Sequence, residues 1–221
     1  MKFAPYGIRE IVTQFTLAAV VAAFFVAASF LLAAKVLLLF TLLPLAWVLF
    51  VFYFFRDPQR SVPAGDDNIV SPADGTIVEI TEQEEPEFIG SLTRKTGIFL
   101  SLFSVHVNRS PCGAKVAYLK YTPGRFLSAA SPKSSRQNES NSIGLVTPRG
   151  KILLRQIAGV IARRIICEVK EGDSLEKGEK FGMIKFGSRT EIYLPVQSGF
   201  EWRVSVGQKV KAGETVLGVF K

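Results

Sequence analysis

Residues 15–55 form an almost uninterrupted apolar run in which Lys35 is the only charged residue. Lys35 divides the run into residues 15–34 and 36–55, and each half has the length of a membrane-spanning helix. One helix over the whole run would be about 60 Å long, twice the ~30 Å hydrocarbon core of a bilayer. We therefore predict a membrane anchor of two apolar helices, at about residues 11–34 and 36–55, that turns near Lys35.

The charges that flank the apolar run predict its orientation. Lys2 and Arg9 precede the run, and Arg56 and Arg60 follow it. Basic residues at both ends favour the cytoplasmic side for both ends. The run is too long for a signal peptide and is not followed by a small-residue cleavage site. We expect a protein of the cell membrane whose remaining residues form a domain on the cytoplasmic face.

The chain is basic, with a formal net charge of +8 at pH 7. It shows no nucleic-acid recognition motif and no pattern of interleaved aromatic and basic residues, so we expect no nucleic-acid partner. An anionic lipid surface is the simpler partner for a basic chain that carries a membrane anchor. Cys112 and Cys167 lack the spacing of metal ligands, and we expect no metal. The sequence leaves the formation of a homo-oligomer open.

After the anchor, the sequence predicts a mainly β domain. The anchor is assigned to residues 1–60 and the domain to residues 61–221, with residues 59–68 as a polar linker that contains Pro63 and Gly65. Short β-branched runs are broken by Gly, Pro, Asn and Asp, which is typical of strands and turns. The expected strands are residues 76–81, 97–104, 115–121, 142–147, 151–157 and 163–169, and a short helix is expected within residues 126–135.

Two segments near the C-terminus resemble each other. Residues 171–179 and 205–214 share a pattern of Gly, polar, apolar, polar, Gly and acid, which is typical of the hairpins of lipoyl and biotinyl carrier domains. A β-sandwich-like domain with carrier-domain-like hairpins is therefore the expected fold. A membrane-tethered, carrier-like binding module is an alternative function, although Lys185 lacks the surroundings of a modified carrier lysine.

Three residues are candidates for chemistry. His106 is the single histidine of the chain, and it follows an apolar run; an imidazole titrates near neutral pH and is the default acid or base. Asp74 lies between a proline-containing turn and Gly75. Ser188 follows Gly187, which leaves the Gly187 carbonyl sterically open to attack by the serine hydroxyl. An Asp, a His and a Ser can form a triad in this chain order, and no Gly-x-Ser-x-Gly elbow is present.

Eight short motifs occur in order along nearly the whole chain, and together they closely resemble the short, membrane-anchored form of the phosphatidylserine decarboxylase proenzyme family. The motifs are Phe55-Arg56-Asp57-Pro58, Ser71-Pro72-Ala73-Asp74-Gly75, Val105-His106-Val107-Asn108-Arg109, Tyr121-Thr122-Pro123-Gly124, Asn138-Glu139-Ser140-Asn141, Gln156-Ile157-Ala158-Gly159, Ala162-Arg163-Arg164-Ile165 and Phe186-Gly187-Ser188-Arg189.

This resemblance implies an enzyme that makes its own cofactor. The Gly187–Ser188 bond would be cut autocatalytically into a β chain, residues 1–187, and an α chain, residues 188–221, which stay associated. Ser188 would become a pyruvoyl group that forms a Schiff base with phosphatidylserine in the membrane. Carbon dioxide would then leave, because the iminium accepts the electrons, and phosphatidylethanolamine would be the product. A relative that acts on another serine headgroup lipid, such as archaetidylserine, is the alternative within this class.

The sequence departs from larger members of the family at Arg109, where they carry a second histidine. Either His106 serves both self-cleavage and protonation, or Arg109 binds the phosphate or carboxylate and water supplies the proton. Arg109, Arg189 and Asn108 are candidates for substrate binding on this resemblance. Further candidates for a phosphate contact are Arg163, Arg164, Lys133 and Arg136.

Overall fold

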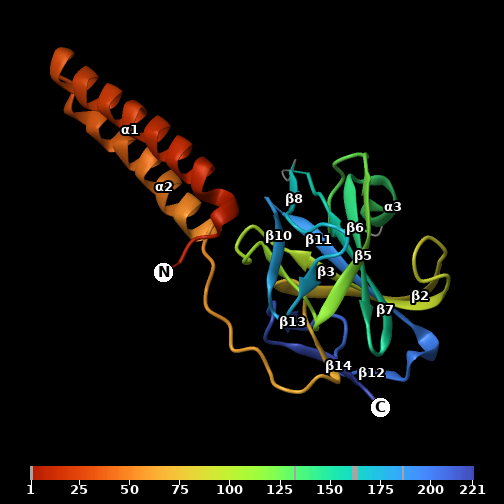
Figure 1. Cartoon of the computed structure of the whole chain (residues 1–221). Helices are drawn as coiled ribbons and strands as arrows, with labels where there is room; N and C mark the ends of the chain where they lie inside the picture. The colour runs from red at the N-terminus through yellow and green to blue at the C-terminus, as the bar shows by residue number, and fades with distance from the viewer. Residues whose placement is uncertain (1, 132, 161–163, 186) are drawn as a thin grey trace. The chain divides into compact units, whose positions relative to one another are not determined.

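The computed structural model describes residues 2–131, 133–160, 164–185 and 187–221. The chain divides into two compact units, Met1–Pro58 and Gln59–Lys221 (Figure 1). Two residues of the expected site region, Arg163 and Phe186, lie outside the described residues.

The first unit is a pair of apolar helices, as the sequence predicts. It consists of a 3₁₀ segment Pro5–Gly7, α1 Ile8–Leu31, a second 3₁₀ segment Lys35–Thr41 and α2 Leu42–Phe54. The two helical stretches Pro5–Leu31 and Lys35–Phe54 are 27 and 20 residues long, with mean hydropathies of 2.2 and 2.5, so both are long and apolar enough to cross a membrane. Their large apolar side chains are mostly exposed, as expected of helices whose solvent is lipid.

Polar and aromatic contacts join the two helices of this unit. The indole Nε1 of Trp47 in α2 donates a hydrogen bond to Oε1 of Gln14 in α1 at 3.0 Å, which satisfies both polar groups within an apolar surface. Phe25 and Phe40 stack with ring centroids 5.4 Å apart. At the open end of the pair, the amide of Ala4 donates to the carbonyl of Phe55 at 2.9 Å.

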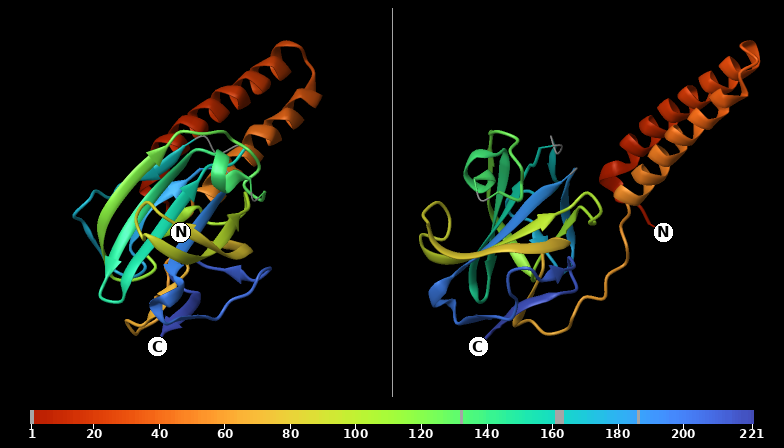
Figure 2. Two further views of the ribbon diagram at one scale, coloured as in Figure 1. Left: turned by 90° about the vertical axis from the view of Figure 1, so that its right-hand side faces the viewer. Right: turned by 180° about the vertical axis from the view of Figure 1, so that it is seen from behind.

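The second unit is built on one antiparallel sheet of eight strands in the order β13-β2-β3-β11-β7-β6-β5-β9. Figures 1 and 2 show how strongly the sheet curls. Strand β11 lies near its middle, between β3 and β7. The bounds are β2 Gly75–Glu85, β3 Ser91–Leu100, β5 Ala114–Thr122, β6 Ser140–Thr147, β7 Gly150–Ile157, β9 Ser174–Leu175, β11 Ser188–Pro195 and β13 Lys209–Val210.

Two small sheets complete this unit. One has the order β4-β10-β8 and consists of β4 Val107–Arg109, β8 Ile165–Cys167 and β10 Lys180–Ile184; the other has the order β1-β14-β12 and consists of β1 Asn68–Val70, β12 Phe200–Trp202 and β14 Val216–Phe220. A 3₁₀ segment Val196–Ser198 follows β11. The apolar core includes alternating side chains of the large sheet and one side chain of β10. They are Ile98, Leu100, Ile143, Leu154, Ile192 and Leu194 of the large sheet and Phe181 of β10.

The two similar segments near the C-terminus supply the two edge strands of the large sheet. Strand β9 lies in the first segment and pairs with β5, whereas β13 lies in the second and pairs with β2. The two segments also meet in space, since a Cβ added to Gly213 would lie 3.6 Å from the Cα of Gly178. The two similar segments thus bring the two edges of the curled sheet close to each other.

The prediction of a mainly β domain is confirmed, but three local predictions differ from the structure. The expected strand at residues 97–104 ends at Leu100, because the amide of Ser104 donates to the carbonyl of Ser101 at 3.0 Å and closes a serine-rich turn. The expected helix within residues 126–135 is instead the single turn α3 Ser134–Gln137. Of the strand expected at residues 163–169, only β8 is formed.

Candidate active site

Ser188 begins β11, in the interior of the protein. Its backbone pairs with Leu100 of β3, and the side chain is fully buried. Among the described residues, no hydrogen-bond partner of Ser188 Oγ is found. A buried hydroxyl without a partner is unfavourable by about 1–3 kcal/mol. Ser188 is therefore held in place by its strand while its hydroxyl is left available for chemistry.

The residue on the other side of the bond has an unusual backbone conformation. Gly187 has a φ of +65°, which favours glycine because a Cβ is strained there. Its amide donates a hydrogen bond to Nε2 of His106 at 3.4 Å. The structure thus brings together three of the predicted site residues, Gly187, Ser188 and His106, although His106 lies 81 positions away in the chain.

His106 lies in the buried segment that leads into β4, one residue before that strand. Its carbonyl accepts a hydrogen bond from the amide of Ile184 in β10 at 3.3 Å. Strand β10 also leads, through residues 185–187, to Ser188. The pairing of β4 with β10 therefore delivers the imidazole to the start of β11.

Gly159 contacts the carbonyl of Gly187 and was missed by the sequence reasoning as a site residue. A Cβ added to Gly159 would lie 2.0 Å from the carbonyl oxygen of Gly187 and 3.3 Å from the Cβ of Ala129. Real Cβ atoms do not approach an oxygen so closely. The sequence signals were its place in the motif Gln156-Ile157-Ala158-Gly159 and its position two residues beyond the end of a strand. The absence of a side chain at Gly159 leaves room for the carbonyl that the serine would attack.

The side-chain amide of Asn108 makes hydrogen bonds through both its nitrogen and its oxygen. Its Nδ2 donates to Oγ1 of Thr190 at 3.0 Å, and its Oδ1 accepts from Nε2 of Gln156 at 2.9 Å. Nδ2 also lies 3.4 Å from the carbonyl of Pro72. Because Asn108 and Thr190 stand two residues beyond His106 and Ser188, this bond fixes β4 against β11 close to the site. The contacts support a positioning role for Asn108.

Arg189 points to the opposite face of the sheet from Ser188, because side chains alternate along a strand. It is fully buried. Its Nε donates to Oε1 of Glu191 at 2.7 Å, and its Nη2 binds Oε2 of Glu79. The guanidinium lies over Gly97 of β3, where an added Cβ would be 2.3 Å from Nη2. Arg189 is thus the centre of a buried ionic network.

A bulge in β2 directs Glu79 into this network. The register of β2 against β3 shifts between Ile77 and Glu79, and the extra residue turns the Glu79 carboxylate to the face on which Arg189 lies. Lys95 Nζ binds Glu79 Oε1 at 3.0 Å. Burial alone would raise the pKa of Glu79, but the hydrogen bonds from Lys95 and Arg189 outweigh it and hold the pKa below its usual value.

The other carboxylate of the network is Glu191, which is fully buried. The hydroxyls of Tyr193 and Ser135 donate to its Oε2 at 2.6 and 3.0 Å, and Lys95 lies 3.8 Å from Oε1. Burial, together with the charge of Glu191, raises the pKa of Tyr193 far above its usual value. The second face of β11 therefore carries a network of hydrogen bonds and ion pairs, in which Arg189 Nη1 has no hydrogen-bond partner among the described residues.

Asp74 and Arg109 meet at the junction of the two similar hairpins. The Asp74 carboxylate accepts from Nη2 of Arg60 at 2.8 and 2.9 Å and from the amide of Ala212 at 2.8 Å. Nη1 of Arg109 donates to the carbonyl of Gly178 at 3.0 Å, and Arg109 lies at the far end of β4 from His106. These contacts hold the fold around β4. Arg60, expected to belong to the anchor, is bonded into the second unit.

The remaining basic candidates lie at two places. Arg164 is exposed beside the start of β8. Lys133 and Arg136 line a hollow on the side of the ionic network, together with Glu79, Glu82 and Lys95. Within the described parts of the chain, no group of three His, Cys, Asp or Glu side chains could hold a metal ion.

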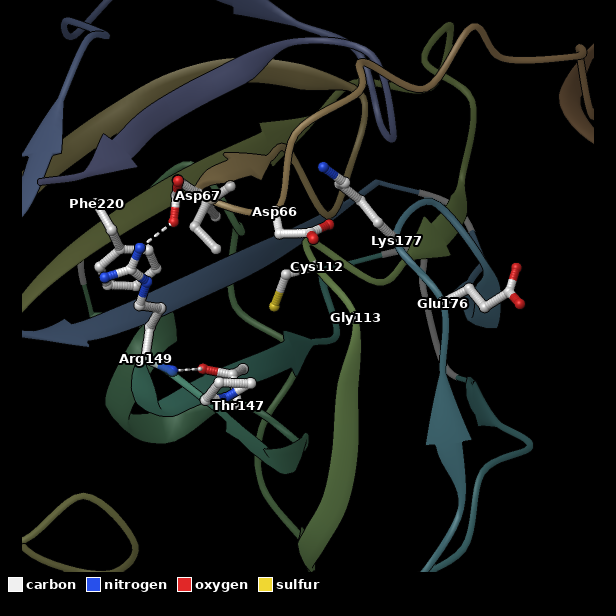
Figure 3. A pocket seen from close by; sticks show the side chains of 11 residues that line it. Asp66, Asp67, Cys112, Gly113, Thr147, Arg149, Glu176, Lys177 and Phe220 are labelled. Atoms are coloured by element: carbon white, nitrogen blue, oxygen red, sulfur yellow. Dashed lines mark hydrogen bonds and ion pairs between the residues drawn. The ribbon is translucent and has the colours of Figure 1, made fainter.

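A separate hollow of about 340 Å³ is lined by none of the predicted site residues (Figure 3). Arg149 and Asp67 form an ion pair there, and the Arg149 amide donates to Oγ1 of Thr147 at 3.1 Å. Burial raises the pKa of the Cys112 thiol in this hollow to about 12, so the thiol stays protonated at neutral pH. The Lys177 ammonium binds the Asn68 side chain, and none of the motif residues that support the proposed chemistry lines this hollow, so we take the start of β11 as the candidate active site.

Comparison with known proteins agrees with this geometry. The family model described as phosphatidylserine decarboxylase matches residues 47–218. The phosphatidylserine decarboxylase proenzyme of Syntrophus aciditrophicus is 50% identical over 179 residues, which cover 80% of this chain and 83% of the relative. That of Desulfotalea psychrophila is 44% identical over 198 residues, covering 89% and 90%. The chain belongs to the phosphatidylserine decarboxylase family.

Proposed function

We propose that this protein is a phosphatidylserine decarboxylase that cuts its own Gly187–Ser188 bond to generate a pyruvoyl group at position 188. The family supports the decarboxylation of phosphatidylserine. One observation carries the self-cleavage: the amide of Gly187 donates to Nε2 of the single histidine, and the buried Ser188 hydroxyl has no partner among the described residues.

The self-cleavage follows from the groups around this bond. His106 takes the proton of Ser188 Oγ, and the oxygen attacks the carbonyl carbon of Gly187. The amide bond breaks, and an ester joins the two residues while the Ser188 nitrogen becomes an amine. Loss of the Ser188 Cα proton then expels Gly187 as a carboxylate and leaves a carbon–carbon double bond at residue 188. Tautomerisation and hydrolysis release ammonia and leave a ketone at the start of β11.

The residues around position 188 fit such a group. The ketone would supply an electron sink for the bond that breaks when the serine headgroup loses carbon dioxide. His106, the one imidazole, is the group that we assign to return a proton to the substrate carbon. Asn108 positions β4 through Thr190, and Asp74 holds the neighbouring turn through Arg60. Arg109 and Arg189 make structural contacts in this proposal.

The pairing of strands supports association of the two fragments after cleavage. Residues 188–221 contain β11, which pairs with both β3 and β7, and β14, which pairs with β1. The two apolar helices associate the protein with the membrane. We further propose that the second unit lies on the cytoplasmic face, because Lys2, Arg9, Arg56 and Arg60 flank the helices.

Mass spectrometry of the purified full chain tests the proposal. We expect two fragments that break between Gly187 and Ser188, and a carbonyl reagent should label only the smaller one. The preparation should release carbon dioxide from phosphatidylserine that is labelled in the serine carboxyl group. The Ser188→Ala variant should remain a single inactive chain. An intact wild-type chain that decarboxylates the lipid would contradict self-cleavage, and cleaved protein without decarboxylation would contradict the reaction.

A further inference from the structure

Three loops of the second unit lie around Gly187 and Gly159; the Ala129 Cβ of the third lies 3.3 Å from the position of a Cβ on Gly159. In the turn at residues 101–104, Leu102 Cδ2 lies 3.9 Å from the position of a Cβ on Gly187. The loop after β7 contributes Gly159, against the Gly187 carbonyl. The loop after β5 contributes Ala129, and the side chain of Asn138 ties this loop to the previous one through bonds to Leu127 and Ala158 at 2.8–2.9 Å.

These loops carry exposed apolar side chains close to the residues around Gly187. Phe103, which follows Leu102 in the turn, is 66% exposed, the highest value among the described large apolar residues of this unit. Val160 follows Gly159 and is 56% exposed, and Phe126, three residues before Ala129, is 37% exposed. Each loop thus has one residue near the site and an exposed apolar side chain close to it in sequence.

The charges of the same loops have one sign. Residues 101–106, 123–131 and 158–164 contain no Asp or Glu. Arg125 and Arg164 are exposed within them. A surface that combines exposed aromatic and aliphatic side chains with basic groups complements an anionic bilayer, since the apolar groups enter the interface and each basic residue gains about 1 kcal/mol near it.

We propose that Phe103, Val160 and Phe126 form a docking rim that inserts into the surface of an anionic bilayer. The inference rests on the proposed function, because it explains how a lipid headgroup reaches the buried position 188 while its acyl chains stay in the membrane. The rim is a contact of the second unit with lipid, additional to that of the two apolar helices.

Fluorescence quenching tests the insertion without reference to activity. Phe103→Trp and Val206→Trp variants of the full chain are placed in vesicles of anionic lipids with brominated acyl chains. Val206 is the matched control, because it is 60% exposed and lies between β12 and β13. Trp47 and Trp202 give the same background in both variants. We expect quenching of the added tryptophan at position 103 and not at position 206; equal quenching at both positions would overturn the proposal.

Kinetics then test whether the rim serves the reaction. The Phe103→Asp variant should cleave itself normally and decarboxylate a short-chain phosphatidylserine dissolved as monomers at the wild-type rate. With vesicles of long-chain phosphatidylserine its rate should fall by roughly fivefold or more, whereas Val206→Asp should match the wild type. An equal loss on both substrates would overturn the docking role. If the wild-type chain is inactive on both the short-chain and the long-chain substrate, the proposed function is contradicted. The quenching experiment alone would then test whether the rim inserts into the bilayer.

Discussion

The two faces of β11 are bonded in opposite ways. On one face, Ser188 is buried without a hydrogen-bond partner among the described residues, and the bond before it lies beside His106. On the other face, Arg189 and Glu191 bind each other and are contacted by four further side chains, those of Glu79, Lys95, Ser135 and Tyr193. One face of the strand is thus held by a side-chain network, whereas the other carries the hydroxyl to which we assign the proposed self-cleavage.

The largest effect is expected at the reactive face. Replacing His106 by Ala removes the only imidazole, so self-cleavage should slow by about 10²–10⁴-fold. The rate is measured as the conversion of freshly refolded precursor into two fragments on a gel. Added imidazole should restore part of the rate, because it can enter the space that the side chain leaves. Unchanged processing of His106→Ala would remove this residue from the role of base.

On the opposite face, the Arg189→Met variant should lose stability. It removes one of the two cations that contact Glu79 and Glu191 and leaves Lys95 as the other; loss of one partner of a buried ion pair destabilises a protein by about 3–5 kcal/mol. Denaturant unfolding of the second unit measures this loss. The control is Arg94→Met, whose ion pair with Glu82 is exposed and contributes at most about 1 kcal/mol. An equal effect of the two variants would show that the network on the second face is no stronger than a surface pair.

Gly159→Ala tests the room around the reacting carbonyl. The added methyl group would push against the oxygen of Gly187, and overpacking of this kind is unfavourable by about 1–3 kcal/mol. We expect this strain to displace the Gly187 carbonyl from the position in which the Ser188 hydroxyl can attack it. Cleavage should then slow roughly 5- to 150-fold, while the unfolding midpoint changes little. Gly113→Ala is the control, because an added Cβ there meets nothing within 4 Å. Normal cleavage of Gly159→Ala would show that the site accommodates a methyl group beside the Gly187 carbonyl.

The smallest effect concerns acid stability on the network face. The pKa of Glu79 is lower in the folded protein than its usual value. Its ionised form therefore contributes stability above the unfolded pKa, and this contribution is lost as the pH falls through the folded pKa. Stability should fall less steeply below about pH 4.5 in Glu79→Gln than in the wild type, measured by urea unfolding at several pH values. Glu82→Gln, on the exposed side of β2, should keep the wild-type slope.

The sequence alone could predict the residues whose signal is local. His106 is the only histidine, and Gly187-Ser188 carries an open carbonyl in its own two residues, so both could be found without a fold. The apolar run at residues 15–55 likewise predicts a helical pair from its length and its single charge. The β class follows from short β-branched runs between turn residues, although turns rich in serine, such as residues 101–104, hide within such runs.

Residues whose role depends on the register of distant strands could not be predicted in this way. Arg189 follows Ser188 in sequence and was a natural candidate for substrate binding, but the alternation of the strand turns it to the other face. The bulge near Val78 that directs Glu79 toward it leaves no mark in the pattern of hydrophobic residues. Arg109 and Asn108 follow His106, yet their partners, Gly178 in the turn before β10 and Gln156 in β7, come from segments whose position only the tertiary structure defines.

Because Ser188 lies late in the chain, the proposed self-cleavage can occur only after most of the second unit has been synthesised and assembled. The bond to be cut is flanked by β3 and β7, and the residues after it include β12, β13 and β14, which complete both the small sheet with β1 and the edge beside β2. In the proposed reaction, a chain that leaves the ribosome would have no reactive ketone until this last segment had joined the strands that were made first. On the proposed function, molecules that fail to assemble stay uncleaved and inactive, so maturation itself acts as quality control.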